Sequence, residues 1–255
     1  ANGVASATQL AQIKEASVKV AGGFGPIEFE PAQMAWMLKN EAEAINAISQ
    51  NLAMAVMKDQ LNTSIASAVG AIANQSTAKK DVSSTAGISH SALNATDALF
   101  GDRSSNIITR VMNGATFHAL IGQNITNANA LFKADGVQVV DILGKYIVVT
   151  DAPSLYATGT PNVNKVLNLV SGGIVVSNGS DIITNADTTN GKERIVTTFQ
   201  ADYTFGIGLK GYTWDETNGG KSPTDAELAT STNWDKTASD IKNTAGTITI
   251  GDASK

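Results

Sequence analysis

The feature that most constrains the fold is a long helical pattern over residues 30–75. Pro31 suits the first turn of a helix, because its ring fixes φ and its missing N–H would have no partner there. No further proline or glycine occurs between Pro31 and Gly70. Apolar residues recur three or four positions apart, which places them on one helical face. These residues are Met34, Met37, Leu38, Ile45, Ile48, Leu52, Val56, Leu61, Ile65, Val69 and Ile72.

This pattern predicts one continuous helix, roughly 60 Å long at about 1.5 Å per residue. A compact domain of this size is narrower than that, so we expect part of the helix to cross a neighbouring element or subunit. The alternative is two helices separated near Lys58 and Asp59, where the apolar stripe skips a step.

A second long pattern covers residues 195–209, where every second side chain is mainly apolar or aromatic. This period of two predicts a strand with one face buried along its whole length. At about 3.3 Å per residue the strand is roughly 50 Å long, so we expect it to pack along the helix. The residues on the predicted buried face are Ile195, Thr197, Phe199, Ala201, Tyr203, Phe205, Ile207 and Leu209.

Short alternating elements fill the block between these two patterns, so the chain as a whole is predicted to have an α+β fold. Two β-hairpins are expected, one around Leu143-Gly144 and one at Asn178-Gly179, which leads to Ile182 and Ile183. Residues 76–90 are polar and are predicted to be a surface loop. The expected helices lie at 91–100 and 114–124, and the expected strands at 107–112, 137–142, 145–150, 166–170 and 174–176.

The composition excludes several classes of function. The 255-residue chain is 42% hydrophobic and only 16% charged, with a formal net charge of −5, so it has no basic surface for tight binding of nucleic acid. It contains no cysteine, which excludes disulfides, thiolate metal sites and a cysteine nucleophile. No apolar run approaches the ~20 residues of a membrane span.

The search for catalytic and binding motifs finds none that is convincing. Gly206, Gly208 and Gly211 match the dinucleotide-binding pattern G-x-G-x-x-G, but no helical pattern follows them, so we interpret them as close-packing positions in a strand. His90 and His118 are the only histidines, and neither belongs to a motif with metal-ligand spacing. We therefore expect no catalytic, cofactor-binding or metal-binding residues, no cofactor and no enzymatic activity.

The order of the parts resembles that of the HK97-type major capsid proteins of tailed bacteriophages. A glycine-rich joint precedes a long helix, an inserted α+β block follows, and a long strand returns. The segments that carry the resemblance are 18–26 (VKVAGGFGP), 99–102 (LFGD), 108–120 (ITRVMNGATFHAL), 143–151 (LGKYIVVTD), 214–220 (WDETNGG) and 233–235 (NWD).

The resemblance implies an HK97-like fold with a long spine helix, a long-stranded peripheral sheet and an inserted axial α+β domain. Residues 1–30 would be an N-terminal arm, or the remnant of an E-loop, that finds its partner on a neighbouring subunit. Residues 31–90 would form the peripheral P-domain with the spine helix, residues 91–190 the axial A-domain, and residues 191–255 a return to the P-domain.

The implied function is that of a major capsid protein, which self-assembles into the pentamers and hexamers of an icosahedral shell around double-stranded DNA. The implied partners are further copies of the chain, portal, scaffold and decoration proteins, and packaged DNA held by weak, non-specific contact, with no membrane. The implied location is the virion capsid, assembled in the cytoplasm of a bacterial host. Alternatives are an encapsulin-like compartment shell and a β-rich phage tail or surface protein.

Overall fold

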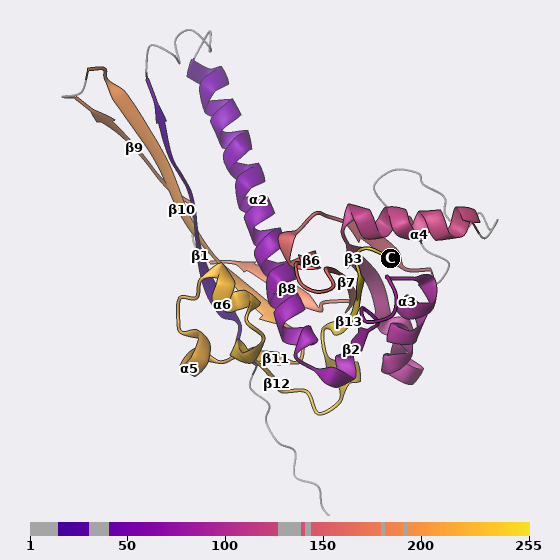
Figure 1. Cartoon of the computed structure of the whole chain (residues 1–255). Coiled ribbons are helices and arrows are strands. Elements are labelled where there is room, and N and C mark those ends of the chain that lie inside the picture. Colours follow the sequence, from indigo (N-terminus) through magenta and orange to yellow (C-terminus); the bar gives the residue numbers. More distant parts are fainter. Residues whose placement is uncertain (1–14, 31–40, 127–138, 141–143, 180–181, 191–192) are drawn as a thin grey trace, which may run out of the picture.

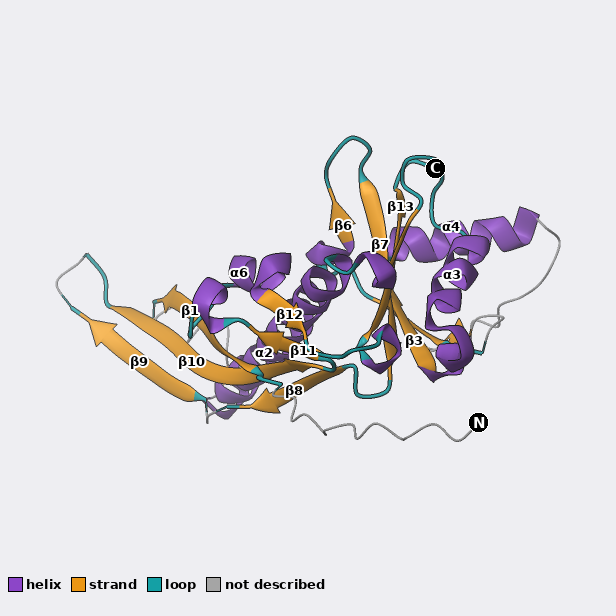
Figure 2. Cartoon of the chain, turned by 90° about the horizontal axis from the view of Figure 1, so that it is seen from below, coloured by secondary structure: helices purple, strands orange, loops and turns teal. Residues whose placement is uncertain are grey.

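Two β-sheets and the long helix α2 (Glu41–Ala73) form the body of the protein (Figure 1). The computed structural model describes residues 15–30, 41–126, 139–140, 144–179, 182–190 and 193–255. A four-stranded sheet extends as a long ribbon beside α2, and a seven-stranded sheet lies near the C-terminal end of α2 (Figure 1 and Figure 2). The mixture of helices and sheets agrees with the predicted α+β class.

Strand β10 (Val196–Leu209) is the centre of the four-stranded sheet. Strand β1 (Val18–Phe29) pairs antiparallel with one edge of β10, from Val18 opposite Ile207 to Phe29 opposite Thr197. The other edge of β10 pairs first with β8 (Ile174–Asn178) and then with β9 (Ile183–Thr189). We refer to these four strands as the ribbon sheet.

This arrangement corrects the expectation that residues 1–30 find their partner only on another subunit. Residues 18–29 pair with β10 of their own chain, because the backbone of β10 offers them a complete free edge. Residues 1–14 lie outside the described residues.

The predicted hairpin at Asn178-Gly179 is wrong. Strands β8 and β9 do not pair with each other; both run antiparallel to β10, one after the other along the same edge. The backbone N–H of Gly179 donates to the carbonyl of Thr204 at 3.0 Å, so the chain continues along β10 where a two-residue turn would reverse it. Pairing with a long neighbouring strand outweighed the local turn preference.

The seven-stranded sheet has the order β2-β13-β7-β3-β5-β4, with β6 pairing to β7. Pairing of β4 with β5 confirms the strands expected on either side of Leu143-Gly144, although residues 141–143 lie outside the described residues. The strands are β2 (Lys79–Asp81), β3 (Ile107–Met112), β4 (Val139–Val140), β5 (Tyr146–Val149), β6 (Tyr156–Ala157), β7 (Val163–Val170) and β13 (Gly246–Asp252).

The remaining elements are short and cover this sheet or close the end of α2. Helices α3 and α4 lie on the face of the seven-stranded sheet that is opposite α2, through Leu93 and Leu120 packed on Met112 and Val166. These elements are α3 (His90–Asp97), α4 (Gly114–Thr126), β11 (Tyr212–Trp214), α5 (Glu216–Gly219), α6 (Asp225–Ala229), β12 (Trp234–Lys236) and the 3₁₀ turns Ser76–Ala78, Ala98–Asn106, Pro153–Leu155, Ser231–Asn233 and Ile241–Asn243.

Helix α2 is continuous over its 33 described residues and passes through Lys58 and Asp59 without a break, which confirms one helix over two. Residues 31–40 lie outside the described residues. Among the predicted stripe residues, Leu52 is buried and Val56 is partly buried against the main core, and residues 63–72 are buried on almost every side. Leu61, which also belongs to the stripe, and Met57 are exposed. The first half of α2 extends past the seven-stranded sheet and has the ribbon sheet beside it (Figure 1).

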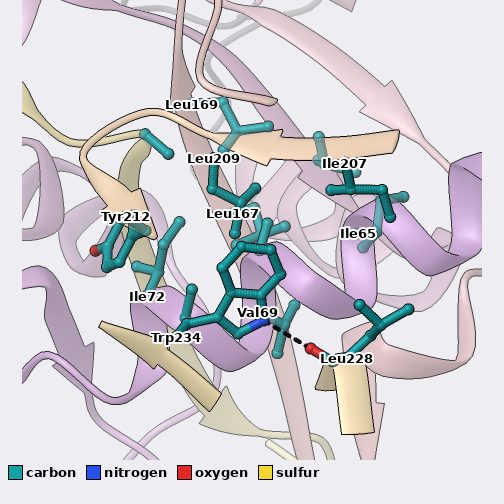
Figure 3. Packing of buried hydrophobic residues seen from close by; sticks show 14 of the residues in the cluster. Ile65, Val69, Ile72, Leu167, Leu169, Ile207, Leu209, Tyr212, Leu228 and Trp234 are labelled. Atoms are coloured by element: carbon teal, nitrogen blue, oxygen red, sulfur yellow. Dashed lines mark hydrogen bonds between the residues drawn. The ribbon is translucent and has the colours of Figure 1, made fainter. Parts of the chain in front are cut away.

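The main hydrophobic core joins α2 to both sheets (Figure 3). Ile65, Val69 and Ile72 pack between strand residues of the seven-stranded sheet and strand residues of the ribbon sheet. Those strand residues include Leu167 and Leu169 of β7 and Ile207 and Leu209 of β10. The indole N–H of Trp234 donates to the carbonyl of Leu228 at 2.9 Å and closes one side of this core (Figure 3).

The division between the sheets does not follow the sequence boundary at residue 190. Strands β8 and β9 precede that residue but belong to the ribbon sheet, whereas β13 follows it and belongs to the seven-stranded sheet. Local patterns cannot reveal this exchange, because strand partners that are far apart in the sequence determine which sheet a strand joins.

The burial of β10 also differs from the expectation of one face buried throughout. Side chains at alternate positions are buried from Ala201 to Leu209, but Ile195 is 54% exposed and Phe199 is half-buried. The outer part of the ribbon sheet has no seven-stranded sheet beneath it, which explains the difference.

We therefore expect opposite results from the same substitution at two positions of the predicted face. Phe205→Asp buries an unpaired carboxylate at a fully buried site and should cost on the order of 4 kcal/mol, enough to abolish soluble folded protein. Ile195→Asp should change the free energy of unfolding by about 0.5 kcal/mol or less, because the side chain is exposed. Urea unfolding of the purified subunits measures both, and similar losses in the two variants would contradict this burial pattern.

Candidate functional site

The two histidines lie apart from each other. His90 is the first residue of α3, and His118 is an exposed residue of α4 whose ring contacts Phe117 edge-on with the ring centroids 5.5 Å apart. Among the described residues, no group of three or more His, Asp or Glu side chains is arranged to hold a metal ion.

The glycine motif lies in a strand and the turn that follows it. Gly206 and Gly208 belong to β10, and Gly211 has a positive φ of 76° in the turn before β11. A Cβ at Gly206 would lie 2.6 Å from the hydroxyl oxygen of Ser177, so this glycine permits the close approach of β8, as the close-packing interpretation predicted.

A buried group of three charges lies under α3 and ties it to β3 and to the start of β5. One carboxylate oxygen of Asp97 accepts from Arg110 Nη2 at 2.7 Å and lies 2.8 Å from Lys145 Nζ. The side chain of Arg110 is fully buried, and those of Asp97 and Lys145 are exposed by only 6% and 8%. Charges in such a position must be paired, because burial in low dielectric strongly disfavours an unpaired ion.

The sequence analysis did not identify this group. The available signal was Arg110, the one charged residue within the otherwise apolar and β-branched strand 107–112. An arginine in such a strand requires an acidic partner. The sequence offers no means of choosing Asp97, because the contact depends on how α3 lies across the sheet.

A second polar contact connects the middle of α2 to the ribbon sheet. The hydroxyl of Tyr203 donates to Asp59 Oδ2 at 2.7 Å. Burial, followed by the hydrogen bond to Asp59 and its negative charge, raises the pKa of Tyr203. The tyrosine ring occupies the space over Gly22 of β1, where a Cβ would lie 2.4 Å from the ring, so the contact requires glycine there. Tyr203 thus joins α2, β10 and β1 at one point.

Two grooves lie on the ribbon sheet beside this contact, although Leu52 of α2 is buried. A groove of about 540 Å³ lies between Val56 of α2 and Ile182, and another of about 400 Å³ lies beside Ala21 and Ile183. Met54 and Met57, on the outer half of α2, are 61% and 69% exposed. The outer half of α2 and the ribbon sheet therefore expose several apolar side chains, among them Met54, Met57 and Ile183. Exposed apolar side chains that gather in one region are typical of an interface between proteins.

The buried charges lead to a prediction about stability. Asp97→Asn leaves Arg110 and Lys145 buried without a counter-charge and should lower the free energy of unfolding by about 3–5 kcal/mol. The matched control is Asp102→Asn, because Asp102 forms an exposed ion pair with Lys242 that also lowers the pKa of its carboxyl, and its loss should have little effect. Thermal unfolding of the subunits measures both, and equal effects would show that the buried group does not stabilise the fold.

Comparison with known proteins identifies chains that share this fold. Within the part of the chain that the structure describes, no helix has both the length and the apolar character needed to span a membrane. A search of curated proteins found no match. Three solved structures share the fold at very low sequence identity, and all three cover most of both chains.

The first is the holo-SrpI encapsulin complex of Synechococcus elongatus PCC 7942, with a TM-score of 0.53, 7% identity and coverage of 94% of this chain and 75% of that one. The second is the capsid of cyanophage Pam1, with a TM-score of 0.50, 11% identity and coverage of 98% and 82%. The third is the acid-stable capsid of Helicobacter pylori bacteriophage KHP30, with a TM-score of 0.51, 9% identity and coverage of 99% and 82%.

These likenesses establish an HK97-like capsid fold, as the sequence resemblance predicted. The model of the Gp13-like family, described as major capsid protein 13-like, matches residues 1–248. The chain therefore belongs to the Gp13-like family of major capsid proteins.

Proposed function

We propose that this major capsid protein forms the pentamers and hexamers of an icosahedral shell that encloses double-stranded DNA. The observation that carries the proposal is the match of residues 1–248 to a family of major capsid proteins, in a chain whose fold is that of phage capsids. The role is structural, and the chemistry of the protein is association between copies. Head-to-tail contacts between copies generate closed rings when the rotation between neighbours closes.

Within the subunit, we assign α2 and the ribbon sheet to the peripheral domain. The seven-stranded sheet with α3 and α4 is assigned to the axial domain that gathers around the capsomer axis. The shape of the chain supports this division, because α2 and the ribbon sheet extend together away from the compact seven-stranded sheet (Figure 1). The shared core around Ile65 and Val69 makes the two domains one rigid unit, which suits a repeated building block.

The charge of the chain supports a container that holds DNA weakly. Only 16% of the residues are charged and the formal net charge is −5, so the chain lacks the excess of Lys and Arg that neutralises phosphates in tight DNA complexes. The same low charge density limits repulsion between packed copies. Portal, scaffold and decoration proteins complete the proposed set of partners, with assembly in the cytoplasm of a bacterial host.

An encapsulin-like compartment is the second candidate, because the SrpI encapsulin complex shares the fold with a TM-score of 0.53. Both candidates are closed shells of the same fold and differ in what the shell contains. A phage shell contains DNA and carries a tail at one vertex, whereas a compartment of this kind contains protein cargo.

Electron microscopy of the protein alone and of particles from infected cells tests the proposal. We expect closed hollow shells from the purified protein, and DNA-filled shells with tails from the cells. Shells that contain protein cargo and no DNA would favour the compartment. A chain that stays monomeric under all assembly conditions would contradict both candidates.

A further inference from the structure

Strand β9 forms a free edge of the ribbon sheet that points away from the rest of the chain. In both views of the molecule, β9 lies on the outer side of β10, whereas β1 lies between β10 and α2 or α6 (Figure 1 and Figure 2). All seven residues of β9 are exposed, and among the described strands β9 pairs only with β10. One row of its backbone N–H and C=O groups therefore faces outward, ready to pair with another strand.

Two other edge strands, β1 and β2, carry features that block such pairing, and β9 does not. Strand β1 contains Lys19, and its pairing register shifts at Gly25-Pro26, where proline removes a backbone donor. Strand β2 is only three residues long and consists of two lysines and an aspartate. Strand β9 has seven residues and no proline, glycine or lysine, and Asp187 is its only charged residue.

The sequence of β9 is complementary to itself in one register. Two copies of β9 related by a two-fold axis perpendicular to the sheet run antiparallel. Side chains of residues that lie opposite each other then point to the same face of the sheet only when the axis passes between the two copies of one residue. An axis at Asp187 would bring two carboxylates together. An axis at Ala186 pairs all seven residues and places the small alanines at the centre. The opposite pairs are then Ile183 with Thr189, Thr184 with Thr188, Asn185 with Asp187, and Ala186 with its own copy.

These cross-strand pairs are favourable ones. Thr184 and Thr188 are β-branched and able to hydrogen bond to each other, and the amide of Asn185 donates to the carboxylate of Asp187. Ile183, which is 70% exposed in the single chain, gains contact with the methyl group of Thr189. No like charges oppose each other.

We propose that β9 is an assembly edge, where two subunits join their ribbon sheets by antiparallel pairing of β9 with β9 across a two-fold axis of the shell. The proposal rests on assembly of the chain into a shell. A seven-residue strand is roughly 23 Å long, so each such contact is small, and it acts through repetition over the shell.

Cysteine cross-linking provides the test, because the natural chain contains no cysteine. In the proposed register the two copies of Ala186 face each other with Cα atoms about 4.5–5.5 Å apart, within the range that a disulfide spans. Assembled shells of Ala186→Cys should therefore form a disulfide-linked dimer on mild oxidation, seen by non-reducing electrophoresis. Thr184→Cys shells should not, because two copies of residue 184 would be offset by four residues, roughly 13 Å.

Two further samples identify the register and the partner. Shells assembled from a mixture of Thr184→Cys and Thr188→Cys subunits should cross-link, because these two positions face each other. A second chain of different identity seated on β9 would leave all of these samples uncross-linked in shells that assemble normally, and that result would overturn the proposal. Equal cross-linking of Ala186→Cys and Thr184→Cys would overturn the register.

Substitutions at the axis keep the proposal testable without oxidation. Ala186→Asp would place two carboxylates face to face, so the melting temperature of the shells should fall while that of unassembled subunits stays unchanged. Ala186→Ser is the matched control and should leave both unchanged. Failure of the unmodified protein to form any shell would count against the proposed function, whereas normal shells of Ala186→Asp would count against the β9 contact alone.

Discussion

The packing of one half of α2 between two sheets is the contact on which the rest of the structure depends. Ile65, Val69 and Ile72 contact strands of both sheets, so the helix joins elements that share no strand. Burial of such side chains contributes about 1.5–3 kcal/mol each, which makes this core the main source of cohesion between the sheets. The other half of α2 projects from this core together with the ribbon sheet.

Two polar contacts hold elements that the main hydrophobic core does not hold in place. The carboxylate of Asp97 holds Arg110 and Lys145, and so orients α3 relative to β3 and β5. The contact of Tyr203 with Asp59 joins α2 to the ribbon sheet, beside the groove between Val56 and Ile182. The subunit thus has a well-packed centre, and its outer half exposes the edge of β9 and the side chains of Met54 and Met57.

Strong periodicity allowed the sequence to predict the two longest elements. The helix around Ile65 and the strand around Phe205 each keep one pattern over many residues, and both occur in the structure. The order of these parts was also enough to identify the capsid fold. The exposure of Leu61 could not be foreseen, because this residue continues the apolar stripe although its own chain leaves it 45% exposed.

Strand partners were the other feature that local patterns could not determine. Asn178-Gly179 has the strongest local signal for a hairpin, yet β8 continues along β10, because pairing with a long strand contributes more than one turn. Asp97 is an ordinary residue at the end of a short helix until the fold places it beside Arg110. Contacts of this kind depend on the tertiary arrangement and leave only an indirect trace in the sequence.

Hydrogen exchange of free subunits and assembled shells is the most direct test of a subunit with a rigid centre and an assembly-competent outer half. Backbone amides of α2 residues 63–72 should exchange slowly in both states, because their core lies within one chain. The amides of β9 that face away from β10 should exchange rapidly in free subunits and become protected in shells. Rapid exchange of residues 63–72 in folded free subunits, or unchanged exchange of β9 on assembly, would contradict this account.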